Sequence, residues 1–225
     1  MTAGRRGRVP EEQPDWELLR RRMVRSQIEG RGVRDQRVLE ALGRVPRHLF
    51  VPEASRRSAY DDTPLPIGHG QTISQPYMVA LMTEALCLRP GAKVLEVGTG
   101  SGYQAAVLAE LACEVHTVEC IPALAEAARG RLLALGYNRV RVHSIDGSPG
   151  LPEEAPFAAV LVTAGGPRVP GPLRQQLAAD GGVLVIPVGN RLVQTLLRVT
   201  RHGPEYREED LGGCRFVPLV GEEGW

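Results

Sequence analysis

The segment GHGQTISQPYM, residues 68–78, contains side chains that can bind or position a substrate. Two hydroxyl residues, Thr72 and Ser74, flank the apolar Ile73, and glycines and a proline stand on either side. Segments this rich in turn residues connect regular elements, and loops carry functional groups more often than helices or strands do. Ser74 is therefore a candidate nucleophile, a candidate binding group, or only a hydroxyl in a turn.

A glycine-rich stretch, VLEVGTGSGYQ, is the strongest chemical motif in the chain. Gly98, Gly100 and Gly102 follow a short apolar run, and a helical pattern begins directly after them. Glycines at such a turn let the backbone bend tightly and let a ligand lie against bare main chain. Glu119 ends the next predicted strand, 21 residues after Gly98. A carboxylate there can accept both hydroxyls of a ribose; the alternative is a solvated carboxylate at a strand end.

The spacing of this motif narrows the class of cofactor. A dinucleotide fingerprint, G-x-G-x-x-G, places its third glycine inside the helix, whereas the three glycines here lie within five positions. No P-loop lysine follows, so nucleotide phosphates have no obvious anchor. Glu96 stands just before the loop, where a carboxylate repels a pyrophosphate and suits a cationic ligand such as a sulfonium or an ammonium group. An NAD-dependent dehydrogenase is therefore disfavoured.

Hydrophobic periodicity predicts the elements that position these residues. Near the N-terminus, apolar residues at helical spacing predict helices over 15–31, 35–43 and 74–88. Ser74 stands just before the third of these helices, near its N-cap. Farther along, apolar runs and helical patterns alternate. They predict strands at 93–98, 114–119, 139–145, 155–165, 181–189, 194–201 and 214–220, and helices at 101–112, 121–136 and 170–178.

This alternation predicts an α/β fold with a Rossmann-like, doubly wound, mostly parallel sheet and with N-terminal helices added. The last two predicted strands have no helix between them, so an antiparallel strand is expected near the C-terminus. We expect a disordered tail at residues 1–14 and a single domain at 15–225. Within it, residues 15–88 supply the N-terminal helices and a substrate loop, and 89–225 form the cofactor-binding α/β core.

The motifs together resemble a known family. The pattern E-V-G-T-G-S-G, with Asp146-Gly147 after the third predicted strand, resembles the class I S-adenosylmethionine-dependent methyltransferases. Over residues 20–220 the chain is similar to the bacterial protein-L-isoaspartate(D-aspartate) O-methyltransferases. This likeness rests on VLEALGRVPRHLFVPE, LPIGHGQTISQPYMVALMTEAL, KVLEVGTGSGYQAAVLAEL, LVTAGGPRVPGPLRQQLAADGGVLVIPVG and RFVPLV. The resemblance implies methylation of the free carboxyl of L-isoaspartyl and D-aspartyl residues in damaged proteins, which begins repair through a succinimide.

The resemblance also implies roles for individual residues. Ser74 matches the active-site serine of the family, and its loop contacts both cofactor and substrate. The acidic residue after the third strand, Asp146, matches a group that hydrogen-bonds the adenine amino group. The candidate residues for binding S-adenosylmethionine are Thr72, Ile73, Glu96, Gly98, Gly100, Gly102, Glu119, Asp146 and Gly147; those for binding the polypeptide are Thr72, Ser74, Val217, Pro218 and Leu219.

Three positions depart from the family pattern. Ile145 stands where a glycine is usual, and Ser148 where tryptophan or arginine is common. At the start of the fourth strand, Ala158 replaces an aspartate, which removes a carboxylate expected near the carboxyl edge of the sheet. These departures leave the fold expectation unchanged and bear on cofactor binding and substrate choice.

Methyl transfer to a carboxylate fits the residues of the loop. The acceptor has a pKa of about 4 and is ionised at neutral pH, so the reaction needs no general base. Neutral donors such as the Ser74 hydroxyl and backbone N–H groups can align it, whereas a cationic clamp would stabilise the ground state, in which the charge is largest. A nucleophilic serine is disfavoured because no G-x-S-x-G motif is present and no carboxylate partner for the nearby His69 is evident.

Composition limits the partners. The chain has 27 basic and 26 acidic residues and a net charge of +1, which gives no reason to expect nucleic acid or a membrane surface. The arginine-rich N-terminus is interpreted as a solvated helix face, with a nucleic-acid arm as the alternative. The four cysteines include no C-x-x-C pair and predict buried free thiols, without a metal site. We expect a cytoplasmic monomer with no membrane-spanning segment.

Two other functions stay open at this point. The first is a related methyltransferase that modifies an aspartate of one specific, ribosomally made peptide. The second is a cofactor-binding protein without catalysis, which the intact Ser74, Glu119 and Asp146 disfavour.

Overall fold

The computed structural model describes residues 14–111 and 113–225. Residues 1–13 of the predicted disordered tail lie outside the described residues. Within the described residues, no helix is both long enough and apolar enough to cross a membrane.

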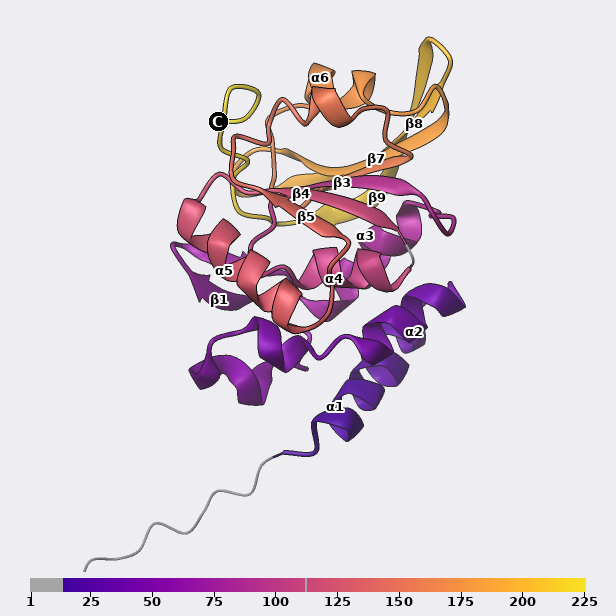
Figure 1. Ribbon diagram of the computed structural model, residues 1–225. Coiled ribbons are helices and arrows are strands. Elements are labelled where there is room, and N and C mark those ends of the chain that lie inside the picture. The colour runs from indigo at the N-terminus through magenta and orange to yellow at the C-terminus, as the bar shows by residue number, and fades with distance from the viewer. Residues whose placement is uncertain (1–13, 112) are drawn as a thin grey trace, which may run out of the picture.

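A seven-stranded sheet forms the centre of the molecule, in the strand order β5-β4-β3-β6-β7-β8-β9 (Figure 1). Strands β3 to β7 pair in parallel, β8 is antiparallel to β7, and β9 is antiparallel to β8. The predicted mostly parallel sheet with an antiparallel strand near the C-terminus is therefore confirmed. The strands are β3 (Lys93–Val97), β4 (Glu114–Val118), β5 (Val140–His143), β6 (Ala159–Val162), β7 (Asp180–Gly189), β8 (Gln194–His202) and β9 (Glu205–Cys214).

The parallel strands are apolar because both faces of the sheet are covered. Successive residues point to opposite faces, so Val94 belongs to one buried cluster and Leu95 to the other. Figure 1 shows α4 and α5 on one side of the sheet and α6 on the other. The helices of this part of the chain are α3 (Pro76–Ala85), α4 (Tyr103–Glu110), α5 (Pro122–Ala134) and α6 (Gly171–Gln175), with a short 3₁₀ helix at Pro152–Glu154.

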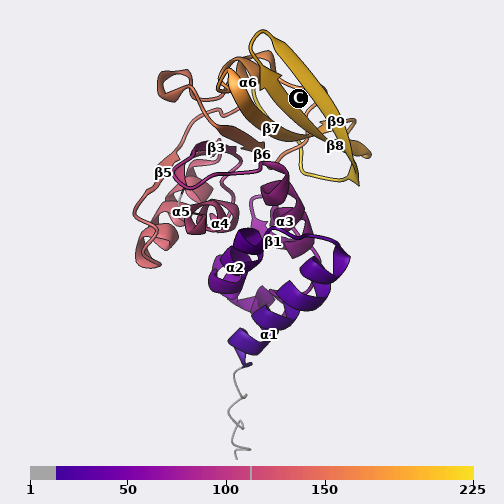
Figure 2. The ribbon, with the colours of Figure 1, turned by 90° about the vertical axis from the view of Figure 1, so that its right-hand side faces the viewer.

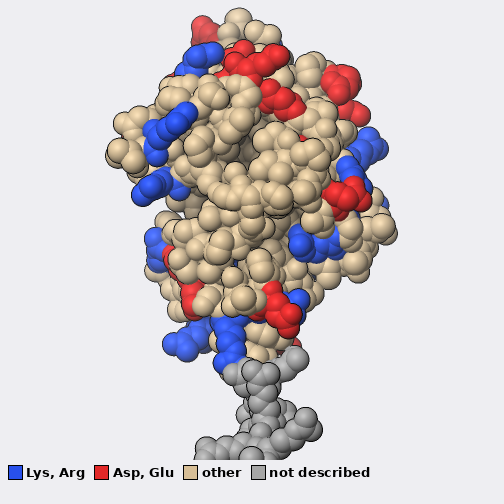
Figure 3. All heavy atoms as spheres, turned by 90° about the vertical axis from the view of Figure 1, so that its left-hand side faces the viewer, with Lys and Arg blue, Asp and Glu red and all other residues tan. Residues whose placement is uncertain are grey.

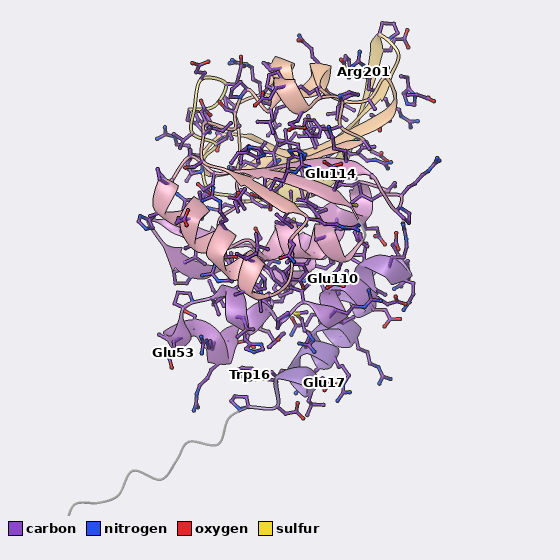
Figure 4. The ribbon with its side chains drawn as sticks, in the orientation of Figure 1. Trp16, Glu17, Glu53, Glu110, Glu114 and Arg201 are labelled. Carbon is purple, nitrogen blue, oxygen red and sulfur yellow. The ribbon has the colours of Figure 1, made fainter. Side chains whose placement is uncertain are left out.

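The N-terminal helices pack on the α4 side of the sheet. Met23 and Ile28 are fully buried in the same cluster as Val94 and Val115 of the sheet. Glu110 of α4 points toward these helices (Figure 4), and its Oε2 lies 3.4 Å from Nη1 of Arg44. The elements are α1 (Trp16–Arg22), a π-helical turn (Met23–Ile28), a 3₁₀ turn (Glu29–Arg31), α2 (Gln36–Arg44), and 3₁₀ helices at Arg47–Phe50 and Glu53–Ser58.

Strand order places a crevice at one edge of the sheet. From β3 the chain builds outward through β4 to β5, then returns to add β6 on the other side of β3. The crossovers therefore leave in opposite directions on either side of β3, and a crevice forms at the carboxyl ends of β3 and β6. Ligands of open α/β sheets bind at such a switch point.

Two segments differ from their predicted form. Leu65–Gly68 (β1) and Gln71–Ile73 (β2) form a short hairpin, where the sequence predicted only a loop. The last strand is β9, Glu205–Cys214, and not residues 214–220. Strand β9 lies at the sheet edge (Figure 2), where charged residues are common, so it lacks the apolar pattern of a strand.

The cysteines are only partly as predicted. None of the four forms a disulfide, and Cys113 is buried. Cys87 and Cys120 are exposed, so the expectation of buried thiols is wrong for them. Cys87 occupies the turn after α3, and Cys120 follows the end of β4, so neither lies within the apolar run beside it.

Candidate active site

The glycine loop turns the chain from β3 into α4 at the crevice. Gly98, Gly100 and Gly102 all have positive φ, at +99°, +52° and +86°. This region of φ is costly for residues with a Cβ, which explains why the three positions are glycine. A Cβ on Gly98 would also collide with Thr163 Oγ1. The hydroxyl of Thr163 donates to the Gly98 carbonyl at 2.8 Å, so the residue that follows β6 helps to hold the loop.

Glu119 follows β4 and braces this loop from the neighbouring strand. One carboxylate oxygen accepts the backbone N–H of Gly100 at 2.8 Å, and the other accepts the N–H of Ile121 at 3.0 Å. Glu119 is 6% exposed. Each carboxylate oxygen can accept more than one hydrogen bond, so both retain capacity toward a ligand.

A cavity of about 340 Å³ opens between these elements. Its walls combine the bare main chain of the loop, the carboxylate of Glu119 and apolar side chains that can flank a flat ring. At Gly147 a Cβ would collide with Val118 and lie 3.1 Å from Cγ1 of Val97, so only glycine fits there. Together, the bare main chain, the carboxylate and the apolar walls suit a nucleoside. The lining is Gln71, Thr72, Val97, Gly98, Gly100, Val118, Glu119, Cys120, Ile121, Gly147, Thr163, Ala164 and 217–220.

Asp146 lies beside this cavity and holds the C-terminal segment. Its carboxylate accepts the N–H groups of Ser148 at 2.8 Å and Glu222 at 3.0 Å. Burial by itself raises the pKa of Asp146, but these hydrogen bonds outweigh burial and hold the pKa below its usual value. The Ser148 hydroxyl accepts the N–H of Glu223 at 3.0 Å. Ser148, which differs from the usual family residue, therefore helps to hold the C-terminal segment. Ile145, which also differs from the family pattern, is exposed.

A larger cleft of about 820 Å³ adjoins the cavity and contains Ser74. The two hollows share Thr72, Thr163, Val217 and Pro218. Figure 3 shows the face that carries β1 and the C-terminal segment, with a hollow near its centre. A group placed in the cavity and a group placed in the cleft can therefore meet at these four residues.

The backbone of Ser74 is anchored from below by a buried arginine that the sequence did not single out. Arg47 is fully buried and donates from Nη2 to the Ser74 carbonyl at 2.8 Å and from Nε to the Ala59 carbonyl at 2.7 Å. The N-cap of α3 is Gln75, one residue beyond Ser74. Within the described residues, the Ser74 hydroxyl has no hydrogen-bond partner, which leaves it available to a ligand in the cleft.

The rest of this segment lies between the two hollows. Thr72 is exposed to both of them, while the side chain of Ile73 is buried and packs in the core. Val217 and Pro218 extend beside Gly165, whose N–H donates to the Val217 carbonyl at 2.8 Å. Leu219 is buried. The structure therefore brings together the candidate residues for the cofactor and those for the polypeptide at one crevice.

Glu96 lies beneath the glycine loop. It is fully buried on β3 and lines a hollow of only about 40 Å³, together with Ser74 and Thr72. Burial raises the pKa of Glu96 to about 8, although the hydroxyl of Thr117 donates to it at 2.6 Å. Its Oε1 has no hydrogen-bond partner within the described residues. Burial therefore favours the protonated form of Glu96 at neutral pH.

The substitution Glu96→Gln is expected to flatten the dependence of stability on pH. The pKa of Glu96 is about 8 in the folded protein, against an ordinary value of 4.5. Between these values the unfolded chain has released a proton that the folded protein keeps, so the free energy of unfolding falls as pH rises and levels off above about 8. Melting temperatures from about pH 5 to pH 9, without ligand, should decline more in the parent protein than in the variant. Equal slopes would contradict the assignment.

The position of Ala158 corrects one expectation. Ala158 precedes the first residue of β6, so it lies at the amino end of this strand, and it lines a separate hollow with Asp180 and Arg198. The absence of a carboxylate there is remote from the cofactor cavity. A residue at the start of a parallel strand lies at the amino edge of the sheet, so the expectation of a carboxylate near the carboxyl edge at this position was wrong.

Sequence reasoning missed several residues that line the two hollows. Thr163 follows the apolar run of β6, and a hydroxyl after a buried strand was the available signal. Arg31, Arg191 and Arg215 line the cleft. The sequence predicted a site without cations from the residues around Ser74, whereas the rest of the cleft wall supplies three. No local pattern marks these arginines, because they come from three separate segments.

Comparison with known proteins agrees with this geometry. The family model described as protein-L-isoaspartate(D-aspartate) O-methyltransferase matches residues 19–224. A protein-L-isoaspartate O-methyltransferase of Roseiflexus sp. (strain RS-1) is 58% identical over 211 residues, covering 94% of this chain and 96% of the relative. One of Syntrophotalea carbinolica is 57% identical over 212 residues, covering 94% and 97%.

Solved structures give the same likeness. A protein-L-isoaspartate O-methyltransferase superimposes with a TM-score of 0.81 and 29% identity, over 91% of this chain and 67% of that one. A structure from Plasmodium falciparum, described as a protein-L-isoaspartate O-methyltransferase in complex with S-adenosyl-L-homocysteine, superimposes with a TM-score of 0.76 and 25% identity. It covers 89% of this chain and 98% of that one.

Proposed function

Because this chain belongs to the protein-L-isoaspartate(D-aspartate) O-methyltransferase family, we propose that its two joined hollows transfer a methyl group from S-adenosylmethionine to the free carboxyl of an isoaspartyl residue. D-Aspartyl residues are the second substrate, and the methyl ester begins repair by closing to a succinimide. The observation that carries this proposal is the meeting of two hollows at Thr72, Thr163, Val217 and Pro218: the cavity lined by the glycine loop and Glu119, and the cleft that contains Ser74.

The smaller cavity holds the cofactor. S-adenosylmethionine supplies a methyl group activated by a sulfonium. Main chain at Gly98–Gly102 lies against it, Glu119 accepts hydrogen bonds from the ribose hydroxyls, and Asp146 with Gly147 receives the adenine end. Glu96 contributes from beneath the loop, where a cation would favour its ionised form.

The larger cleft holds the damaged polypeptide. Its carboxyl arrives ionised, with a pKa of about 4, so no residue of this chain needs to remove a proton. The Ser74 hydroxyl donates a hydrogen bond that aligns the carboxylate oxygen, and Thr72 lies beside it. Val217 and Pro218 line this cleft and contact the polypeptide, whereas Leu219 is buried and lines the cofactor cavity, so it was wrongly expected to contact the polypeptide. These groups supply orientation and exclude water, which are the main requirements of an in-line displacement.

A direct assay tests the proposal. The purified protein is incubated with labelled S-adenosylmethionine and one of two peptides of identical sequence, containing either an isoaspartyl or a normal aspartyl residue. We expect the label to enter the isoaspartyl peptide and not its twin. Equal labelling of both would indicate a general aspartate methyltransferase. Cofactor binding with no labelling of either would indicate a protein without catalysis.

The substitution Glu119→Ala is expected to weaken cofactor binding by about 1.5–3 kcal/mol, the range for a hydrogen bond to a charged group. The variant loses the ribose acceptor and also the brace on Gly100. Titration calorimetry with S-adenosylmethionine measures the change. Glu126→Ala, on the exposed side of α5, is the matched control and should bind normally. Unchanged affinity in Glu119→Ala would remove this residue from the site.

The wider setting follows from the same features. We propose a single methyltransferase domain over residues 15–225, since one buried cluster joins the N-terminal helices to the sheet. We further propose a monomer that acts in the cytoplasm on polypeptides, with no nucleic acid or membrane as partner. A net charge of +1 supports this, because it supplies no strong field toward anionic surfaces.

A further inference from the structure

The charged side chains that line the polypeptide cleft are all positive. Three guanidinium groups, those of Arg31, Arg191 and Arg215, line it, and no aspartate or glutamate is among its lining residues. In Figure 3 separate lysine and arginine side chains stand at the left edge of this face, and acidic side chains lie above and to the right of the hollow. The walls of the cleft therefore carry positive charge that the transfer of a methyl group does not require.

One of the three arginines is already neutralised. Arg31 forms an ion pair with Asp62, and its guanidinium carbon lies 3.5 Å from the ring centroid of Tyr77. Within the described residues, Arg191 and Arg215 have no acidic partner. Arg191 lies over the ring of Trp225, with 5.3 Å between the guanidinium carbon and the ring centroid, and Arg215 is exposed.

The two unpaired arginines belong to one fixed framework. Arg191 stands in the turn between β7 and β8, where the side chain of Asn190 accepts the N–H groups of Leu192 at 2.8 Å and Val193 at 2.9 Å. The buried amide of Gln194 then accepts the N–H of Phe216 at 2.8 Å. This bond ties the β7–β8 turn to the segment that carries Arg215 and continues into Val217 and Pro218.

We propose that Arg191 and Arg215 give this enzyme a preference for isoaspartyl sites whose flanking residues are acidic. The inference rests on the proposed function and deepens it, because it names the class of polypeptide that the cleft selects. With the isoaspartyl carboxyl at Ser74, neighbouring residues of an extended polypeptide run along the cleft wall. Aspartate and glutamate side chains there meet uncompensated positive charge, whereas lysine and arginine are repelled.

The preference is tested with three isoaspartyl peptides that differ only in the residues flanking the damaged one: glutamate, glutamine or lysine. At about 0.01 M salt, where the Debye length is about 30 Å, we expect KM to rise from the glutamate to the lysine peptide. The total difference should be about three- to tenfold, in the range for a few partly exposed ion pairs. At about 0.15 M salt the Debye length falls to about 8 Å and the ranking should narrow. The value of kcat should change little.

Charge-removing variants locate the effect. The double variant Arg191→Gln/Arg215→Gln should bring the three KM values to within about twofold of one another. Arg207→Gln, an exposed change on β9 outside the cleft lining, is the matched control and should keep the ranking. Charge reversal by Arg215→Glu should weaken or invert it.

The outcomes separate the two proposals. Equal KM values for the three peptides, with normal methylation of all, would overturn the acidic preference and leave the proposed function intact. A ranking that survives in the double variant would overturn the assignment to these arginines. Failure to methylate even the glutamine peptide would instead count against the proposed function.

Discussion

Replacing Ser74 with alanine is expected to lower kcat/KM for an isoaspartyl peptide by about tenfold to a hundredfold. This is the loss of one hydrogen bond to a charged group, converted to a rate. The hydroxyl has no partner within the described residues and lies in the cleft, so its removal leaves no group of the protein unsatisfied. Stability and the glycine loop should therefore be unaffected.

Three measurements define this prediction. Steady-state kinetics measure the loss of kcat/KM. Calorimetry should show a cofactor affinity within about twofold of that of the parent protein. Kinetics of Ser74→Thr should show part of the rate recovered, because this variant restores a hydroxyl. Ser55→Ala, in the 3₁₀ helix Glu53–Ser58, is the matched control and should be fully active. A loss confined to cofactor affinity would show that Ser74 acts on the cofactor and not on the acceptor.

Replacing Arg47 with methionine is expected to reduce the free energy of unfolding by about 2–5 kcal/mol, since one buried and one partly buried carbonyl each lose a donor. Arg47 donates to the carbonyls of Ala59 and Ser74 and lies over the ring of Tyr103, with 4.8 Å between the guanidinium carbon and the ring centroid. Burial lowers the pKa of the guanidinium group because the buried charge is poorly solvated. Removing this charge removes its desolvation cost, which offsets part of the stability lost with the hydrogen bonds.

The same substitution should also affect catalysis. Without the bond to its carbonyl, Ser74 is no longer held in register with the cleft, so kcat of the folded variant should fall while cofactor affinity is retained. Chemical denaturation and kinetics well below the melting temperature separate the two effects. Arg44→Met, at an exposed arginine of α2 that pairs with Glu40, should change stability by no more than about 1 kcal/mol. Unchanged stability together with unchanged kcat in Arg47→Met would contradict the anchoring role.

Much of the fold follows from local patterns in the chain. The apolar runs of β3, β4, β6 and β7 and the helical patterns between them predict a parallel sheet. The last strand shows where this reasoning fails: β9, with the sequence EYREEDLGGC, is an edge strand held by backbone pairing to β8 and carries little apolar pattern. The hairpin of β1 and β2 was missed for a similar reason, since each of its strands is only three or four residues long.

The candidate site divides in the same way. The glycine loop and Glu119 could be paired from sequence because adjacent parallel strands end at the same edge, and the N–H of Gly100 indeed donates to Glu119 at 2.8 Å. The anchor from Arg47 to Ser74 spans 27 residues, and that from Asp146 to Glu222 spans 76. Neither is marked by a spacing rule.

The sequence by itself determined the class of fold, the cofactor loop with its acidic partner, and the serine loop, because each depends on residues close together in the chain or on strands known to be neighbours. Only the tertiary structure decided what surrounds them. It placed Ala158 at the far end of β6, buried Glu96 beneath the loop, and lined the cleft with arginines from three segments. Such contacts arise from strand register and from the packing of distant elements, and periodicity in the sequence carries no information on either.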